Sequence, residues 1–251
     1  MAQLIGRILL NGESLFVSPD KSNLERYECL VGSFEKGFQG TGKYIASGDV
    51  RFQIPFEAGK LIGIGKNYPS PDEPEEKHIN FFLMAKNALL PHKESLILSK
   101  RIGSLIPEGE LAVVIGKTLK NASSEEAKEA IFGYTICNDF SARDTTPPES
   151  NAAIRKSSDG LLPMGPYLLL ENSLRDFDIR TYCNEKLVQE GNTKSMLHKI
   201  PELISYISDF MTLHPFDVIS TGTPGPKLKV ERGSIIKVEI DGIGFLENKI
   251  V

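Results

Sequence analysis

The sequence predicts a mixed, β-rich α+β protein. Short apolar runs bounded by turn residues recur along the whole length, whereas only two segments have the spacing of a helix. The expected strands are too numerous and too scattered for a doubly wound α/β sheet. With 251 residues, 40% of them apolar, the chain is long enough to bury a core without disulfides or metals that hold it together.

Residues 1–57 are expected to form a small N-terminal β domain. Apolar runs at 3–10 and 14–18 flank Asn11-Gly12, a dipeptide typical of two-residue hairpins. A polar stretch with several glycines follows. Such a unit has little core of its own, so we expect it to rest on the larger domain, residues 58–251.

The larger domain is expected to alternate strands with a few helices. A short helix is predicted over 123–131, with Ser123 or Ser124 as its N-cap, and a longer one over 198–211, with Pro201 in its first turn. The segment 67–80, rich in proline and acidic residues, is expected to be an irregular lid. Strands are expected at residues 60–66, 81–86, 95–99, 110–116, 132–140, 165–171, 179–191, 217–222, 234–240 and 244–251.

Composition excludes several classes of protein. A formal net charge of −4 argues against a polycation built for nucleic acid. The apolar runs are far shorter than the roughly 20 residues of a membrane span, and no signal peptide is expected. The three cysteines are few, odd in number and far apart, which indicates neither a zinc knuckle nor a disulfide framework. A reduced, cytoplasmic protein is the expectation.

Three carboxylates are the main candidates for chemistry. Glu108 and Glu110 are two residues apart at the start of an apolar strand, so their side chains share one face. Like charges so placed repel each other unless a cation lies between them. Asp139 ends another buried-type strand, and the three together would suit Mg²⁺, Mn²⁺ or Ca²⁺. The alternative is two exposed acids at a strand edge and an aspartate that forms a turn.

Basic residues follow the carboxylates in the sequence. Arg143 and Lys156 are placed to bind an anionic substrate or to neutralise an oxyanion. Alternatively, Arg143 pairs with a nearby aspartate and Lys156 is a solvated loop lysine. Thr223 lies in the small-residue loop 221–225, whose hydroxyls and amides would suit a substrate carboxylate, or which is simply a tight turn.

Several of these stretches recur together in one known family. The chain resembles the fumarylacetoacetate hydrolase family, in the branch of smaller bacterial and archaeal enzymes that includes 2-hydroxyhepta-2,4-diene-1,7-dioate isomerases and acylpyruvases. The likeness covers about residues 60–251. The matching stretches are GIGKNY (63–68), MAKNALL (84–90), EGELAVVIGK (108–117), GYTICNDFSARD (133–144), KSSDGLLPMGP (156–166), NTKSM (192–196), STGTPGP (220–226) and GSIIKVEIDGIGFLEN (233–248).

The resemblance implies a mixed β-roll with a small N-terminal β domain, assembled as a homodimer. It also implies a divalent metal, commonly Mg²⁺, that chelates a small anionic 2-oxo acid and stabilises its enolate during C–C hydrolysis, isomerisation, decarboxylation or dehydration. No nucleic acid or membrane partner is implied. The residues it points to are Glu108, Glu110 and Asp139 for the metal, Arg143 and Lys156 for catalysis, and Lys86 and Thr223 for substrate binding.

One departure from the family bears on the reaction. Hydrolytic and decarboxylating members carry a His-x-x-Glu dyad after the Asn-Tyr pair, where this chain has Pro71 and Pro74. Glu75 and His78 are three apart in the reversed order and are a candidate substitute. Without a dyad to activate water, isomerisation or lyase chemistry is favoured. The competing hypothesis is a protein that binds metal and 2-oxo acid without turnover.

Overall fold

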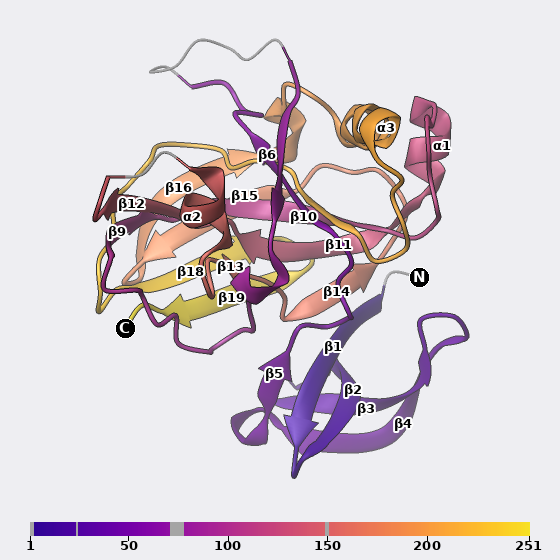
Figure 1. The fold of residues 1–251 in the computed structure, drawn as a ribbon. Coiled ribbons are helices and arrows are strands. Elements are labelled where there is room, and N and C mark those ends of the chain that lie inside the picture. Colours follow the sequence, from indigo (N-terminus) through magenta and orange to yellow (C-terminus); the bar gives the residue numbers. More distant parts are fainter. Residues whose placement is uncertain (1–2, 24, 71–77, 149–150) are drawn as a thin grey trace.

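The computed structural model describes residues 3–23, 25–70, 78–148 and 151–251. Strands dominate, and they form one large mixed sheet and three smaller ones (Figure 1). The strand-rich fold with few helices confirms the predicted fold class. In spatial order the large sheet consists of β4 (Gly37–Ala46), β3 (Arg26–Ser33), β2 (Glu13–Pro19), β1 (Gln3–Leu10), β14 (Tyr167–Leu170), β11 (Ile131–Asn138), β10 (Gly109–Ile115), β17 (Val218–Ser220), β6 (Leu61–Gly65) and β7 (Asn80–Met84), with β5 (Arg51–Gln53) paired to β1.

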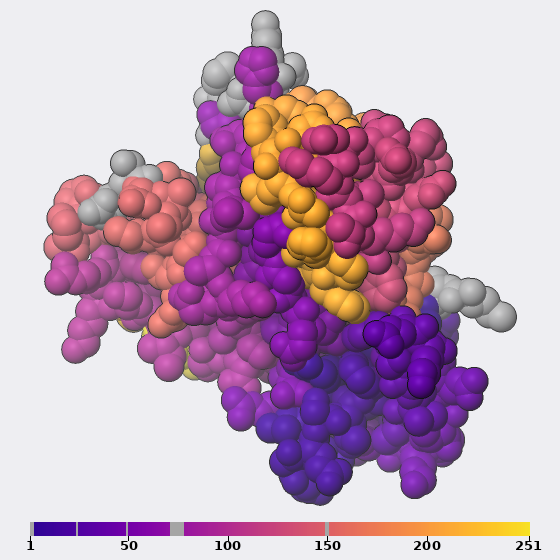
Figure 2. Space-filling model, turned by 45° about the vertical axis from the view of Figure 1, so that its right-hand side comes forward, coloured from indigo at the N-terminus to yellow at the C-terminus, as the bar shows by residue number. Residues whose placement is uncertain are grey.

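The N-terminal strands continue this sheet and also form a lobe of their own. The β1–β2 hairpin turns at Asn11 and Gly12, which have φ of 50° and 85° as a type I′ turn requires. On its other edge β1 pairs with β14, which belongs to the main body. Figure 2 shows the indigo N-terminal lobe projecting below the rest of the molecule. The division between residues 57 and 58 remains a proposal.

Three smaller sheets accompany the large one. One of the two-stranded sheets is antiparallel and the other parallel, and the third sheet has four antiparallel strands. Segment 95–99, expected to be a strand, makes only an isolated bridge between Leu96 and Ile250. The sheets are β12 (Ser141–Thr145) with β9 (Ile102–Ile106), β13 (Leu162–Pro163) with β8 (Leu89–Leu90), and β16 (Lys186–Asn192), β15 (Asp178–Cys183), β18 (Ile235–Ile240) and β19 (Gly244–Lys249).

Two of the three α-helices that the structure describes were predicted from sequence. Helix α1 (Ser124–Glu129) begins at a capping box in which Ser123 and Glu126 bond each other's backbone N–H groups. Helix α3 (Ile200–Phe210) packs against α1 and has proline in its first turn. Helix α2 (Ala152–Ser157), capped by Asn151, was not predicted, because six residues are too few to show helical periodicity.

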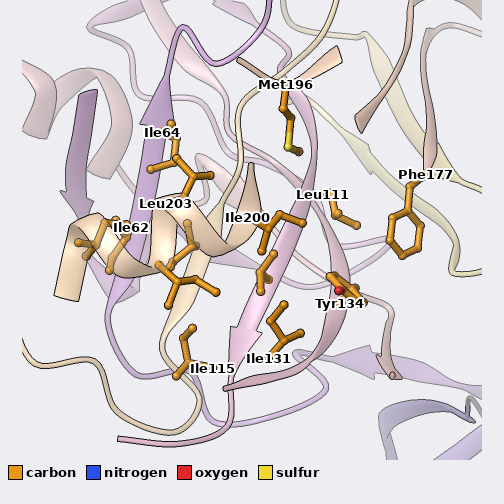
Figure 3. Packing of buried hydrophobic residues seen from close by; sticks show 14 of the residues in the cluster. Ile62, Ile64, Leu111, Ile115, Ile131, Tyr134, Phe177, Met196, Ile200 and Leu203 are labelled. Atoms are coloured by element: carbon orange, nitrogen blue, oxygen red, sulfur yellow. The ribbon is translucent and has the colours of Figure 1, made fainter. Parts of the chain in front are cut away.

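The largest apolar core lies between α3 and the central strands of the large sheet. Ile200 and Leu203 of α3 face Ile62 of β6 and Leu111 of β10 (Figure 3). All seven residues of β10 are buried, which fixes this strand firmly in the sheet. No helix in the described part of the chain is long and apolar enough to cross a membrane.

Candidate metal centre and anion site

The structure brings Glu108, Glu110 and Asp139 together, with one oxygen of each within 4.8 Å of the others. Strands β10 and β11 run antiparallel, so Glu108, just before β10, and Glu110, the second residue of β10, meet the aspartate that follows β11. The Asp139 N–H donates to the carbonyl of Glu108 at 2.9 Å, which closes the strand ends. Glu110 and Asp139 are each 1% exposed, so the alternative of exposed acids at a strand edge does not describe them.

Each carboxylate uses a single oxygen for the side-chain bonds it forms with the described residues. Oε2 of Glu110 accepts hydrogen bonds from the Ser220 hydroxyl and from the Gly222 N–H, the latter at 2.7 Å. Lys156 Nζ bonds Glu108 Oε2 at 2.6 Å and Asp139 Oδ2 at 2.9 Å. Oδ1 of Asp139 is buried with no partner among the described residues.

A buried carboxylate oxygen without a partner is costly, so this arrangement suits a bound cation. The donor set consists of oxygens alone, as Mg²⁺, Mn²⁺ and Ca²⁺ prefer. Glu108, Glu110 and Asp139 therefore fit a divalent cation.

The carboxylates of the cluster are buried close to one another, and this raises the pKa of two of them. Burial first, and then the charges of Asp139 and Glu108, raise the pKa of Glu110 well above its ordinary value. Burial is also the main cause that raises the pKa of Asp139 to about 6. Burial alone would lower the pKa of Lys156, but the Asp139 and Glu108 charges outweigh it and raise that pKa. Lys156 therefore stays a cation inside the site.

Lys156 reaches the carboxylates from helix α2, which packs on strand β12. Its side chain is 10% exposed, and its ammonium also bonds the main-chain oxygen of Asp139 at 2.9 Å. The ammonium lies over the ring of Phe82 in β7 at 5.6 Å. The alternative of a solvated loop lysine is therefore wrong.

The other predicted site residues lie at different depths. Arg143 is half-buried in β12, and it does not pair with Asp144, which bonds Ser104 and Lys229 instead. Thr223 uses its hydroxyl to hold the Gly109 carbonyl at 3.0 Å, between the two glutamates. Lys86 is exposed at the start of a 3₁₀ turn that packs near α2.

Two further residues at the site were missed by sequence reasoning. The hydroxyl of Ser220 donates to Glu110, yet in the sequence Ser220 is only one residue of the expected strand 217–222. Tyr68 is buried, and its hydroxyl has no partner within the described residues. Burial, followed by the charge of Glu110, raises the pKa of Tyr68, so its phenol stays protonated beside the cluster. The sequence signal that could have pointed to Tyr68 is its position directly after Asn67 in the GIGKNY motif.

The structure describes only residues 67–70 and 78–80 of the predicted lid. Residues 71–77, which include Pro71, Pro74 and Glu75, lie outside the described residues. His78 is described and is exposed. A role for Glu75 and His78 as a substitute dyad therefore stays a prediction.

The fold is rich in β-strands, and its acidic centre has the donor set that a hard divalent cation prefers. The family model for the fumarylacetoacetate (FAA) hydrolase C-terminal region matches residues 53–251. The chain therefore belongs to the fumarylacetoacetate hydrolase family.

Named relatives and solved structures support this assignment. A bifunctional isomerase/decarboxylase of 4-hydroxyphenylacetate degradation from Salmonella dublin is 38% identical over 80% of this chain and 49% of its own length. The chain thus spans about half the length of that relative. The structure of 5-carboxymethyl-2-hydroxymuconate delta-isomerase from Mycobacterium smegmatis matches with a TM-score of 0.86 and 33% identity over 99% of both chains. Fumarylpyruvate hydrolase from Pseudomonas aeruginosa, solved with Mn²⁺ and pyruvate, matches 80% of this chain and 91% of its own at a TM-score of 0.71 and 26% identity.

Proposed function

We propose that this protein is a divalent-metal-dependent enzyme that acts on a small 2-oxo acid or its enol. The observation that carries the proposal is the convergence of Glu108, Glu110 and Asp139 beside the buried ammonium of Lys156. Mg²⁺ is the cofactor we propose, with Mn²⁺ or Ca²⁺ as alternatives. The relative solved with Mn²⁺ and pyruvate supports this choice.

The protein's own residues would bind and orient the substrate. When bound, the cation would polarise the 2-oxo group and stabilise the enolate form. Lys156, kept protonated by its two carboxylates, supplies positive charge where an oxyanion develops. Arg143 supplies a second cation, and the Tyr68 phenol supplies a neutral donor that stays protonated.

Isomerisation or a lyase reaction is the chemistry we favour, with hydrolysis of an acylpyruvate as the alternative within the class. Pro71 and Pro74 replace the dyad that activates water in hydrolytic members. Two of the similar proteins named above are an isomerase/decarboxylase and an isomerase, which supports the same preference. A protein that binds metal and 2-oxo acid without turnover remains the second hypothesis, because the same replacement removes a catalytic base.

A panel of 2-oxo acids and their enols tests the proposal. Turnover is followed by the ultraviolet absorbance of the enol, with Mg²⁺ or Mn²⁺ and with an EDTA-treated control. We expect turnover only with metal and none in the Glu110→Gln variant. Metal-dependent binding without turnover of any substrate would favour the non-catalytic hypothesis. Equal turnover in EDTA would refute metal dependence.

A further inference from the structure

A buried thiol begins a chain of hydrogen bonds that ends on Glu110. Cys137 Sγ lies 3.0 Å from the Ser220 hydroxyl, which in turn donates to Oε2 of Glu110. Cys137 is fully buried, and Ser220 and Glu110 are each 1% exposed. The chemistry proposed above gives this thiol no task, so its contact with a residue that supports a candidate metal ligand needs an explanation.

The large sheet brings the three side chains to one face, although they come from three strands. Glu110 of β10 is directly opposite Cys137 of β11, and Ser220 of β17 is opposite Ala112 of β10. Residues opposite each other on paired strands, and residues two apart along a strand, point to the same side. Cys137 and Ser220 therefore meet across β10, where the small side chain of Ala112 leaves room for their contact.

The number of available protons gives the chain of hydrogen bonds a direction. An ionised carboxylate only accepts hydrogen bonds, so Ser220 donates its single hydroxyl proton to Glu110 when that residue holds a cation. The hydroxyl oxygen is then free to accept, and the thiol S–H of Cys137 is the donor that faces it. A hydroxyl held in this way keeps its proton directed at Glu110 instead of rotating away from it.

We propose that Cys137 is a positioning residue of the metal centre, which acts through the Ser220 hydroxyl to hold Glu110 in place for the cation. This inference rests on the proposed function, because Glu110 is a ligand of the proposed metal. Hydrogen-bonded partners of metal ligands tune metal affinity, and the members of such a chain polarise and strengthen one another. The thiol is a weak donor, so its expected contribution is smaller than that of Ser220.

Replacing Cys137 by alanine and by serine separates the hydrogen bond from packing. The two side chains are nearly equal in size, and only serine keeps a donor. Mn²⁺ binding to the full chain is measured by calorimetric titration after EDTA treatment and dialysis. We expect Cys137→Ala to weaken binding about 3- to 10-fold and Cys137→Ser to stay within about twofold of the wild type. Cys183→Ala removes a half-buried thiol of β15 as the matched control and should leave the affinity unchanged.

A double-mutant cycle tests whether the thiol acts through Ser220. Ser220→Ala should itself weaken Mn²⁺ binding about 10- to 100-fold. Adding Cys137→Ala to that variant should change the affinity by less than about twofold more, because the hydroxyl that transmits the effect is gone. The infrared S–H stretching band of Cys137, isolated by subtracting the spectrum of the matching Cys137→Ser protein, should shift in Ser220→Ala, because the thiol has lost its acceptor. Circular dichroism confirms that each variant is folded.

The outcomes separate this inference from the proposed function. Wild-type affinity in Cys137→Ala, an equal loss in Cys137→Ala and Cys137→Ser, or an undiminished further loss in the Ser220→Ala background would each overturn the positioning role while metal binding stands. Absence of Mn²⁺ binding to the wild-type protein would overturn the proposed function and the inference together. A loss of affinity that serine restores at residue 137, and that disappears without the Ser220 hydroxyl, supports the positioning role.

Discussion

In the candidate metal centre, one carboxylate oxygen of Glu110 accepts hydrogen bonds from the Ser220 hydroxyl and the Gly222 N–H. Gly222 has φ of +96°, and a side chain there would meet the Cβ of Asn67 at 2.9 Å. A glycine at this position therefore lets the backbone N–H come close enough to hold the carboxylate. Such supporting bonds orient a ligand before the cation arrives, which is why their geometry matters to affinity.

Replacing Glu110 by glutamine should have opposite effects on metal affinity and on stability without metal. The variant loses one of three negative charges, so we expect Mn²⁺ affinity to fall by more than about 100-fold in calorimetry. Without metal its melting temperature should rise, because a buried like-charge repulsion disappears. Glu129→Gln, an exposed acid of α1, is the matched control. Unchanged Mn²⁺ affinity would contradict the assignment of Glu110 as a ligand.

The raised pKa values of Glu110 and Asp139 predict how stability depends on pH without metal. In the unfolded chain these groups titrate near 4.5 and 3.8, and in the folded protein they titrate higher. Between those values the folded state binds more protons than the unfolded state, so the free energy of unfolding falls as pH rises from about 4 to above 6.

Urea unfolding in EDTA at several pH values, followed by circular dichroism, measures this slope. We expect a steeper decline in the wild type than in Glu110→Gln. Saturating Mg²⁺ should reverse the decline, because the cation binds the ionised carboxylates and its affinity rises with pH. Identical slopes for the two proteins in EDTA would disprove the expectation.

At the scale of elements, Asn67 joins the end of β6 to two segments that are distant in sequence. Its amide nitrogen donates to the carbonyls of Thr221 and His198 at 2.8 and 3.1 Å, and its amide oxygen accepts the N–H of His198 at 2.9 Å. Thr221 precedes Gly222, so these bonds also support the backbone that holds Glu110.

Asn67→Ala should destabilise the fold and loosen the metal centre. It leaves several buried backbone groups without partners, and we expect a loss of about 3 kcal/mol in the free energy of unfolding. Circular dichroism in urea measures this loss, because the chain has no tryptophan for fluorescence. Gln39→Ala, an exposed amide in β4, is the control. A loss no larger than that of the control would show that the three bonds contribute little.

At the scale of the whole molecule, the N-terminal lobe and the main body share a sheet. Residues 3–6 of β1 pair with β14, and apolar side chains of the lobe form their own small cluster around Ile8, Val17 and Phe52. Phe56 packs into a cluster that includes Leu168 of β14. The two parts are thus joined by backbone hydrogen bonds and by apolar contacts.

Deleting residues 1–57 should therefore lower the stability of the remainder. The truncated chain would leave the edge of β14 unpaired, which favours aggregation, and would uncover the apolar surface beneath Phe56. Thermal unfolding and size-exclusion chromatography compare the two proteins. An unchanged melting temperature and a single sharp peak would indicate that residues 58–251 fold independently of the lobe.

The family likeness also predicts a homodimer. Light scattering coupled to size-exclusion chromatography should then give a mass about twice the 27.7 kDa of one chain. A mass equal to a single chain would show that this protein departs from the expected assembly.

The sequence by itself determined the features that depend on neighbouring residues. Asn11-Gly12 predicted the hairpin through its tolerance of positive φ, and Ser123 predicted the start of α1 through its side-chain oxygen. The alternation of side chains along a strand placed Glu108 and Glu110 on one face. Turn chemistry, capping and periodicity act over a few residues, so they can be read from a sequence.

Tertiary structure alone decided how the site is assembled. Lys156 bonds Glu108 across 48 residues, and Ser220 bonds Glu110 across 110. No local pattern predicts such contacts, because they depend on which strands become neighbours in the sheets and on the docking of α2. The sequence therefore indicated which carboxylates converge, and only the packing of distant segments brought the Lys156 ammonium against them.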